Sequence, residues 1–257
     1  MPVSKLDLSK EFVGRRALVT GGSRGIGAAT AQRLLDGGAK VVVVARSRHE
    51  QTPTDATFVS GDVTTNDGAK KLGEEAVKIL GGLDILVNNA ASARAFLQGI
   101  ETIPDEDWIE TVNSCYLSAV RVTNAVLSAL KQSSVGAIVN VSSGGYAAFP
   151  TPLPHYVSAK AALNKYSHFL SKELAPHKIR VNIVTPGMVV TPGADALREQ
   201  FLTAAGLPPE AAKGMVPLGR LGQPQEIAEA IAFLVSDRGE WVTGTNLFVD
   251  GGIMTTA

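Results

Sequence analysis

The sequence has little of what marks several classes of protein. Cys115 is the single cysteine in 257 residues, so no internal disulfide bond can form. The four histidines are scattered, and with one cysteine they make no cluster at zinc-ligand spacing. No apolar run is long enough to span a membrane, and residues 1–10 lack the apolar core of a signal peptide. We therefore expect a cytoplasmic protein with no metal site and no membrane contact.

Surplus charge is also missing. Twenty-four Lys and Arg residues offset 24 Asp and Glu residues, which leaves a formal net charge of zero. Proteins that bind nucleic acids or anionic membranes usually carry a basic surplus, so neither partner is expected. Hydrophobic residues at 45% and charged residues at 19% fit a folded globular protein and exclude a disordered one.

Short apolar, β-branched runs alternate with amphipathic segments along the chain. The runs predict strands buried on both faces at residues 17–20, 41–45, 57–59, 85–87, 137–141, 181–184 and 246–249. The amphipathic segments predict helices at residues 25–36, 67–80, 105–131, 156–174 and 223–235. This alternation predicts an α/β fold of the Rossmann type, a doubly wound seven-stranded parallel sheet with helices on both faces.

The longest interruption of this alternation is rich in proline and glycine and runs from Pro186 to Pro217. It is either a surface insertion or a lid over a pocket, and long ordered loops favour a lid, at about residues 190–216. Length alone leaves one domain or two open. Because the motifs described below extend along one predicted sheet, we expect residues 1–257 to form a single dinucleotide-binding domain.

A glycine-rich turn follows the first predicted strand. It consists of Gly21, Gly22, Ser23, Arg24, Gly25, Ile26 and Gly27. Glycines allow positive φ and a close approach of the backbone to a phosphate, and the N-terminus of the next helix attracts that phosphate. The spacing departs from the common G-x-G-x-x-G, and by itself such a turn could be a bare connector. Its position at the first strand-to-helix turn predicts a dinucleotide site.

The end of the second predicted strand indicates which dinucleotide is bound. A carboxylate there would bind the adenosine ribose of NAD(H), but this strand is followed by Arg46, and no acid occurs before Glu50. An arginine pairs with a 2′-phosphate through its planar fork. Arg24 or Arg46 alone could be a solvated surface residue, but the two together favour NADP(H) over NAD(H).

Tyr156 and Lys160 are four residues apart at the start of a predicted helix, so their side chains share one face. A nearby ammonium would lower the tyrosine pKa from about 10 and suit the phenol for acid–base catalysis. The strand at 137–141 ends in Ser142 and Ser143, where a hydroxyl can hold a substrate oxygen. A nucleophilic serine is the rival interpretation, but no G-x-S-x-G elbow is present. His155 lines either the pocket or only a loop.

Taken together, these motifs resemble the short-chain dehydrogenase/reductase family from about Arg15 to Gly252. The turn from Thr20 to Gly27 is similar to that family's cofactor turn. Further matches to its cofactor motifs are Asp62 and Val63, Asn88, Asn89 and Ala90, and Pro186, Gly187, Val189 and Thr191. The matches to its catalytic tetrad are Asn113, Ser143, Tyr156 and Lys160, with Ser142 as the alternative serine.

The resemblance implies an NADPH-dependent carbonyl reductase, reversible as an alcohol dehydrogenase. Tyr156 would pass a proton to the carbonyl oxygen while hydride moves between nicotinamide and carbonyl carbon, and Ser143 would hold that oxygen. Lys160 would bind the nicotinamide ribose and lower the tyrosine pKa, and Asn113 would order a water molecule. A catalytically silent NADP sensor and a metal-dependent dehydrogenase are the other classes considered.

The expected substrate is a small molecule with a largely apolar part, bound by Ser143, Phe149, His155, Tyr156 and Met188. The chain resembles the 3-oxoacyl carrier-protein reductase branch in outline. Docking of that acidic carrier needs basic residues at the pocket mouth, which the sequence supplies only sparsely. Ala91 stands where the family usually has glycine, and activity is expected to survive this change.

The helices predicted at 105–131 and 156–174 have extensive apolar content and resemble the family's subunit-packing pair. The resemblance implies a homotetramer, with a dimer as the alternative.

Overall fold

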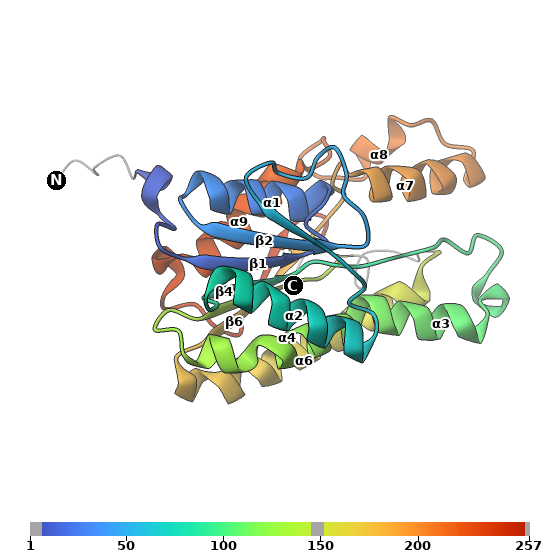
Figure 1. Cartoon of the computed structure of the whole chain (residues 1–257). Coiled ribbons are helices and arrows are strands. Elements are labelled where there is room, and N and C mark those ends of the chain that lie inside the picture. The colour runs from blue at the N-terminus through green and yellow to red at the C-terminus, as the bar shows by residue number, and fades with distance from the viewer. Residues whose placement is uncertain (1–6, 145–151, 255–257) are drawn as a thin grey trace.

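The fold is a seven-stranded sheet between two layers of helices, seen in a computed structural model that describes residues 7–144 and 152–254 (Figure 1). The strands are β1 (Arg16–Thr20), β2 (Lys40–Ala45), β3 (Thr57–Ser60), β4 (Ile85–Asn88), β5 (Ala137–Val141), β6 (Arg180–Pro186) and β7 (Asn246–Val249). All neighbouring strands pair in parallel, in the order β3-β2-β1-β4-β5-β6-β7. The predicted Rossmann-type sheet is confirmed.

The order of the strands locates the binding crevice. From β1 the chain crosses to β2 on one side, whereas β4 lies on the other side of β1. In open parallel sheets such a reversal leaves a crevice at the carboxyl ends of the two strands, and ligands bind there. A ligand-binding site is therefore expected at the carboxyl ends of β1 and β4.

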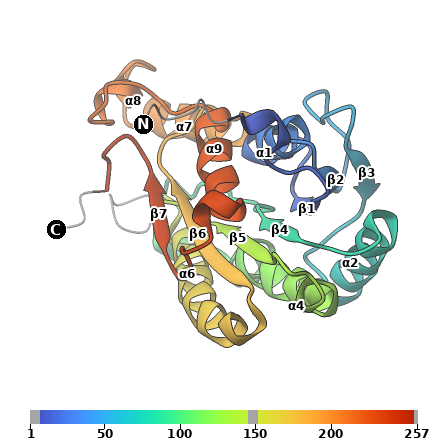
Figure 2. The same ribbon diagram turned by 90° about the vertical axis from the view of Figure 1, so that its left-hand side faces the viewer.

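Helices cover both faces of the sheet. They are α1 (Gly25–Asp36), α2 (Asn66–Leu80), α3 (Asp105–Val112), α4 (Ser118–Lys131), α6 (Pro154–Leu174), α7 (Pro192–Ala204), α8 (Ala211–Gly214) and α9 (Pro224–Val235). Figure 2 shows α1 and α9 together on one face and α2, α4 and α6 on the other. Short 3₁₀ turns lie at Leu8–Lys10, Ile100–Thr102, Ala175–His177 and Asp237–Gly239. Within the described ranges, no helix combines the length and apolar character needed to cross a membrane.

The structure corrects the sequence-based elements in three places. The expected helix at 105–131 is interrupted by a π-helical turn, Asn113–Leu117, between α3 and α4. The strands β3 and β7 are not buried on both faces, because each lies at an edge of the sheet with one neighbour. The expected lid segment at 190–216 is largely helical and contains α7 and α8, which lie at the same end of the molecule as α3 (Figure 1).

A buried ion pair ties β1 to the start of β4 at the end of the sheet opposite the crevice. Asp84 is 5% exposed. Its carboxylate accepts from Arg16 Nε (2.8 Å), from Arg16 Nη2 (2.9 Å) and from Ser133 Oγ (2.7 Å). Burial by itself would raise the pKa of Asp84, but the hydrogen bonds from Arg16 and Ser133 outweigh burial and hold the pKa below 3.8. The folded state therefore favours the ionised form.

Replacing Asp84 by Asn should lower the free energy of unfolding by about 2–4 kcal/mol at pH 7, because Arg16 loses its buried partner. Since the folded pKa is lower than the unfolded one, this contribution is present above about pH 4 and is lost as the pH falls through the folded pKa. Urea denaturation of both proteins at pH 7 and pH 3 checks this.

The control is Asp237→Asn, which removes the partner of Arg15 at a carboxylate that is 74% exposed. An exposed pair contributes about 0–1 kcal/mol, so this variant should stay close to the wild type. Equal stabilities of wild type and Asp84→Asn at pH 7 would contradict the account.

Candidate active site

Hydrogen bonds join the carboxyl ends of β1 and β4 at the crevice. Thr20 Oγ1 accepts from the backbone N–H groups of Asn89 (3.0 Å) and Ala90 (3.1 Å). In return, Asn89 Nδ2 donates to the carbonyl oxygens of Thr20 and Gly21, both at 3.1 Å. The segment after β4 therefore holds the glycine turn in place. Because the Asn89 side chain is used in this way, Asn89 and Ala90 border the turn as its supports.

The glycines of the turn stand where no side chain fits. A Cβ atom on Gly27 would lie 2.3 Å from the Gly21 carbonyl oxygen, and one on Gly22 would lie 2.7 Å from a methyl carbon of Val43. Gly21 has a φ of +65°, a conformation that favours glycine. The turn thus brings the N-terminus of α1 close to the end of β1. This cradle fits a dinucleotide phosphate.

Three arginines lie in the glycine turn or just after β2. Arg24, Arg46 and Arg48 are exposed, and within the described part of the chain none of them forms an ion pair. Ser60 Oγ donates to the Arg46 carbonyl oxygen (3.0 Å), which fixes the backbone at the end of β2. The positive charges at this edge of the crevice are therefore available to an anionic ligand.

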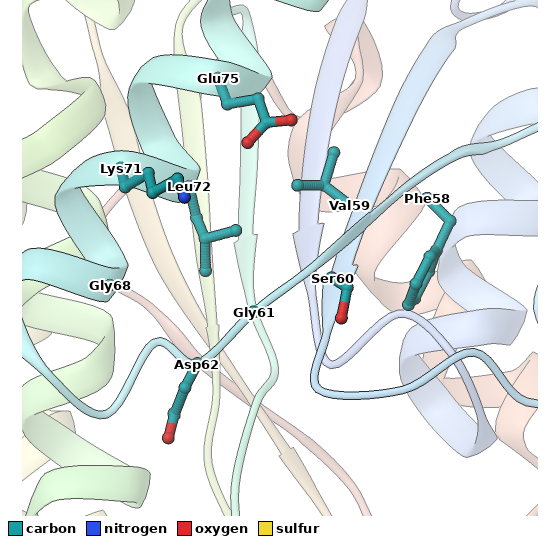
Figure 3. A pocket seen from close by; sticks show the side chains of 9 residues that line it. All are labelled: Phe58, Val59, Ser60, Gly61, Asp62, Gly68, Lys71, Leu72 and Glu75. Carbon is teal, nitrogen blue, oxygen red and sulfur yellow. The ribbon is translucent and has the colours of Figure 1, made fainter.

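Asp62 and Val63 lie just beyond β3. Asp62 Oδ1 accepts from the backbone N–H of Thr64 (2.8 Å), and Val63 is buried. Asp62 also borders a pocket of about 260 Å³ between β3 and α2 (Figure 3). The other residues that line this pocket are Phe58, Val59, Ser60, Gly61, Gly68, Lys71, Leu72 and Glu75. Asp62 is the one predicted site residue in this lining, which contains none of the predicted catalytic residues. The pocket at this edge of the sheet is therefore separate from the site around Tyr156.

The residues after β5 and at the start of α6 form the centre of the site. Lys160 is 2% exposed, and its Nζ donates to the Val141 carbonyl oxygen (2.7 Å) at the end of β5. The same Nζ lies 5.8 Å from the centre of the Tyr156 ring. Tyr156 and Ser143 are joined by a side-chain hydrogen bond. The structure thus brings together three of the four residues predicted to be catalytic. Ser142 Oγ is buried, and among the residues that the structure describes it has no hydrogen-bond partner.

The pKa of Tyr156 moves in the direction opposite to the expectation. Burial raises the pKa of Tyr156 above its ordinary value of 10.0, and the electrostatic effect of nearby Cys115 raises it further. The hydrogen bond with Ser143 lowers this pKa, but by less than the other two effects raise it. Lys160 does not bring the pKa of Tyr156 back below its ordinary value. Burial lowers the pKa of Lys160 as well, and its Nζ is directed to the Val141 carbonyl oxygen. The folded state therefore favours the protonated phenol.

This direction can be tested by spectroscopy. Because the pKa of Tyr156 is raised, its neutral phenol should persist as the pH rises to 10. An ultraviolet titration should then give the same phenolate absorbance up to pH 10 for the wild type and for Tyr156→Phe. An additional tyrosine titrating near or below pH 8 in the wild type alone would show that the lysine lowers the pKa after all.

Asn113, the fourth predicted catalytic residue, opens the π-helical turn. Its Oδ1 accepts from Arg121 Nη2 (2.9 Å), and Arg121 also donates to the Thr64 carbonyl oxygen. Cys115 of the same turn influences both Tyr156 and Lys160 electrostatically, so this turn lies beside the pair. π-Helical turns occur often at functional sites, where they displace a side chain from the regular helical pattern. Cys115 is a neighbour that the sequence reasoning missed.

A buried chain of hydrogen bonds supports the site from within the sheet. Asn140 on β5 accepts from Asn88 Nδ2 (2.9 Å) and donates to Ser167 Oγ on α6 (2.7 Å). Asn88 Nδ2 also donates to Thr123 Oγ1 on α4 (3.1 Å). The chain fixes α4 and α6 relative to β4 and β5. The sequence did contain a signal for it, since Asn140 interrupts an otherwise apolar strand.

The predicted substrate residues differ in their positions. His155 is 1% exposed, and it contacts the ring edges of Phe96 (5.4 Å between centroids) and Trp108 (5.8 Å). It is thus packed between Phe96, in the segment before α3, and Trp108 on α3. Met188 is half-buried after β6. Phe149 lies outside the described residues.

The segment after β6 returns to the glycine turn. Gly187 donates from its backbone to the Val249 carbonyl oxygen (3.1 Å), Val189 is buried, and Pro186 ends β6. Thr191 caps α7 by accepting from the Ala194 N–H (3.2 Å). A Cβ on Gly25 would lie 3.2 Å from the Thr191 methyl carbon, so Thr191 lies against the turn.

A hollow of about 490 Å³ lies beside α7 on its side facing the segment before α3. Its lining consists of Leu97, Ala196, Glu199, Gln200, Thr203 and Ala204.

A parallel sheet with a glycine cradle at its switch point and a Ser, Tyr and Lys group beside it defines a dinucleotide-dependent oxidoreductase. A family model described as enoyl-(acyl carrier protein) reductase matches residues 21–254. The 3-oxoacyl-(acyl-carrier-protein) reductase of Escherichia coli (strain K12) is 36% identical over 255 residues, which cover 94% of this chain and 98% of that protein. The chain belongs to the short-chain dehydrogenase/reductase family of NAD(P)-dependent enzymes.

Solved structures agree with this assignment. The ligand-free aldohexose dehydrogenase of Thermoplasma acidophilum has a TM-score of 0.85 and 28% identity, and the match covers 96% of this chain and 99% of that one. A structure described as the Pseudomonas aeruginosa RhlG/NADP active-site complex also has a TM-score of 0.85, with 30% identity and the same coverage.

Proposed function

We propose that the protein is an NADPH-dependent oxidoreductase that interconverts a carbonyl group and a secondary alcohol on a largely apolar small molecule. The observation that carries the proposal is the hydrogen-bonded pair of Tyr156 and Ser143, placed over buried Lys160. A catalytically silent sensor of the dinucleotide would need no such acid beside the cradle, so the enzyme is favoured over the sensor.

The residues that would hold the cofactor lie around the cradle. The glycine turn and Ile26 would receive the phosphates at the N-terminus of α1, with Arg24 and Arg46 at the 2′-phosphate. Further candidates are Asp62 and Val63 after β3, Asn89 and Ala90 after β4, and Pro186, Gly187, Val189 and Thr191 at and after the end of β6. When bound, the nicotinamide supplies or accepts the hydride of the reaction.

Each catalytic side chain has a distinct task. In the direction of reduction, Tyr156 donates its phenolic proton to the carbonyl oxygen, for which its raised pKa keeps the proton available. Ser143 donates a hydrogen bond to the same oxygen and stabilises the charge that develops there. The Lys160 ammonium, beneath the tyrosine ring, favours the phenolate left after the transfer. Asn113 would order a water molecule that returns the proton.

Replacing Tyr156 by Phe removes the acid and keeps the ring. Carbonyl reduction should slow by about 10²- to 10⁴-fold, the usual contribution of a general acid, while NADPH binding stays within about threefold. Turnover at saturating substrate and NADPH affinity by fluorescence titration check this. Tyr166→Phe is the control, because it removes from the same helix a tyrosine hydroxyl that is hydrogen-bonded to Thr123. Unchanged turnover in Tyr156→Phe would exclude this mechanism.

The preference for NADPH depends on Arg46. In Arg46→Asp a carboxylate would repel the 2′-phosphate, so NADPH affinity should fall at least about tenfold more than NADH affinity. The matched control is Lys40→Asp, at the opposite end of β2, which changes exposed charge by the same amount. Equal losses for the two cofactors in Arg46→Asp would remove Arg46 from the 2′-phosphate site.

The alternative substrate is a 3-oxoacyl group carried by an acyl carrier protein. The name of the Escherichia coli relative favours this alternative. Its weakness is the small number of basic residues available for docking an acidic carrier.

Residues 1–257 would act as one domain, in which 190–216 forms a lid over the substrate. The homotetramer is also a proposal. Ile109 on α3 and Phe169 on α6, exposed by 61% and 63%, support packing of this helix pair against another subunit. The cytoplasmic location stays a prediction.

A further inference from the structure

The connection from β2 to β3, residues 46–56, contains no helix and folds over the glycine turn. Residues 49–52 of this connection, called the strap, contain the side chains that hydrogen-bond to the glycine turn and to the start of α1. Thr52 is 5% exposed, and its Oγ1 donates to the Ser23 carbonyl oxygen (3.2 Å) while accepting from the His49 N–H (3.0 Å). The strap is therefore anchored to the turn at one buried hydroxyl.

The next contact of the strap lies at the helix end itself. Gln51 Oε1 accepts from the backbone N–H of Gly25 (2.9 Å), the first residue of α1. The Gln51 N–H donates to His49 Nδ1 (3.2 Å), which holds the backbone that carries this side chain. Arg24 precedes the helix and provides no side-chain acceptor for its first N–H groups. Gln51 thus caps α1 from a distant part of the chain.

A neutral amide oxygen is a weak partner for this position. The first N–H groups of a helix carry partial positive charge and bind anions more strongly than neutral acceptors. Gln51 is exposed, so its side chain can leave without opening the core. Arg24 and Arg46, on either side, are exposed cations without an ion pair in the described part of the chain. A phosphate reaching the Gly25 N–H would meet Gln51 first.

We propose that Gln51 sets nucleotide affinity by occupying, with its amide oxygen, the place of a dinucleotide phosphate at the Gly25 N–H. The inference rests on the proposed binding of a dinucleotide at this turn. Binding then exchanges one hydrogen bond for another, so the affinity measured is lower than that of an uncapped cradle. The side chain at position 51 therefore lowers nucleotide affinity by competing for the Gly25 N–H.

Nucleotide fragments without a nicotinamide test this without any turnover. ADP carries the diphosphate, and 2′,5′-ADP carries the 2′-phosphate without the diphosphate. In Gln51→Ala, calorimetric titration should give two- to tenfold tighter binding of at least one fragment, because about one neutral hydrogen bond no longer has to be broken. Tighter binding of ADP alone identifies the diphosphate as the competitor, and tighter binding of 2′,5′-ADP alone identifies the 2′-phosphate.

The control for Gln51→Ala is Gln32→Ala on the same helix, which removes a side-chain amide paired with Asp36 (2.7 Å) away from the cradle. It should leave both affinities unchanged. If Gln51 were only a structural cap, Gln51→Ala would lower the melting temperature without tightening either fragment. That result, or weaker binding of both fragments, overturns the proposal.

The isosteric variant Gln51→Glu supplies a second test. Its carboxylate would bind the helix N-terminus more strongly than the amide and would repel phosphate. The fragment identified by Gln51→Ala should bind at least tenfold more weakly, with a melting temperature equal to or above that of the wild type. Wild-type affinity in this variant would also overturn the proposal. These tests need no carbonyl substrate, so failure of the proposed reaction leaves them unaffected, and their failure leaves Tyr156 untouched.

Discussion

The hydrogen bond from Lys160 to the Val141 carbonyl oxygen is the constraint on which the site depends. It attaches the second turn of α6 to the end of β5, and this attachment places Tyr156 within reach of Ser143. Further along α6, the bond between Asn140 and Ser167 fixes the helix to the same strand a second time. A buried ammonium costs free energy unless it is hydrogen-bonded, and the bond to the Val141 carbonyl oxygen offsets part of that cost.

Burial also decides the chemistry of the tyrosine. Withdrawing the phenol from water disfavours its ionised form more than the Ser143 hydrogen bond favours it. The folded state therefore favours the protonated phenol, which is the form that the proposed reduction of a carbonyl needs. On the other side of the crevice, Thr20 and Asn89 hold the glycine turn to the end of β4. Tyr156 and the glycine turn are thus held by separate groups of hydrogen bonds to neighbouring strands of one sheet.

Much of the fold could be predicted because parallel strands are apolar runs, and the turn and the Tyr156 and Lys160 pair follow from local spacing. The π-helical turn at Asn113 could not, since a locally widened helix keeps an amphipathic pattern. The direction of the Tyr156 pKa shift and the aromatic contacts of His155 do not follow from local spacing, because the first depends on Cys115 and the second on Phe96, both distant in sequence. The cap of α1 by Gln51 could not be predicted for the same reason, because this hydrogen bond joins two separate loops.

The central claim is that this arrangement performs carbonyl reduction. The most direct measurement is an assay of the wild type with NADPH and with NADH against a panel of apolar ketones and 3-oxoacyl thioesters, in which cofactor oxidation and alcohol product are both quantified. The account predicts one alcohol formed for each NADPH oxidised with at least one class of substrate, and slower turnover with NADH. Tight NADPH binding without alcohol formation from any member of the panel would contradict it and would favour a silent sensor.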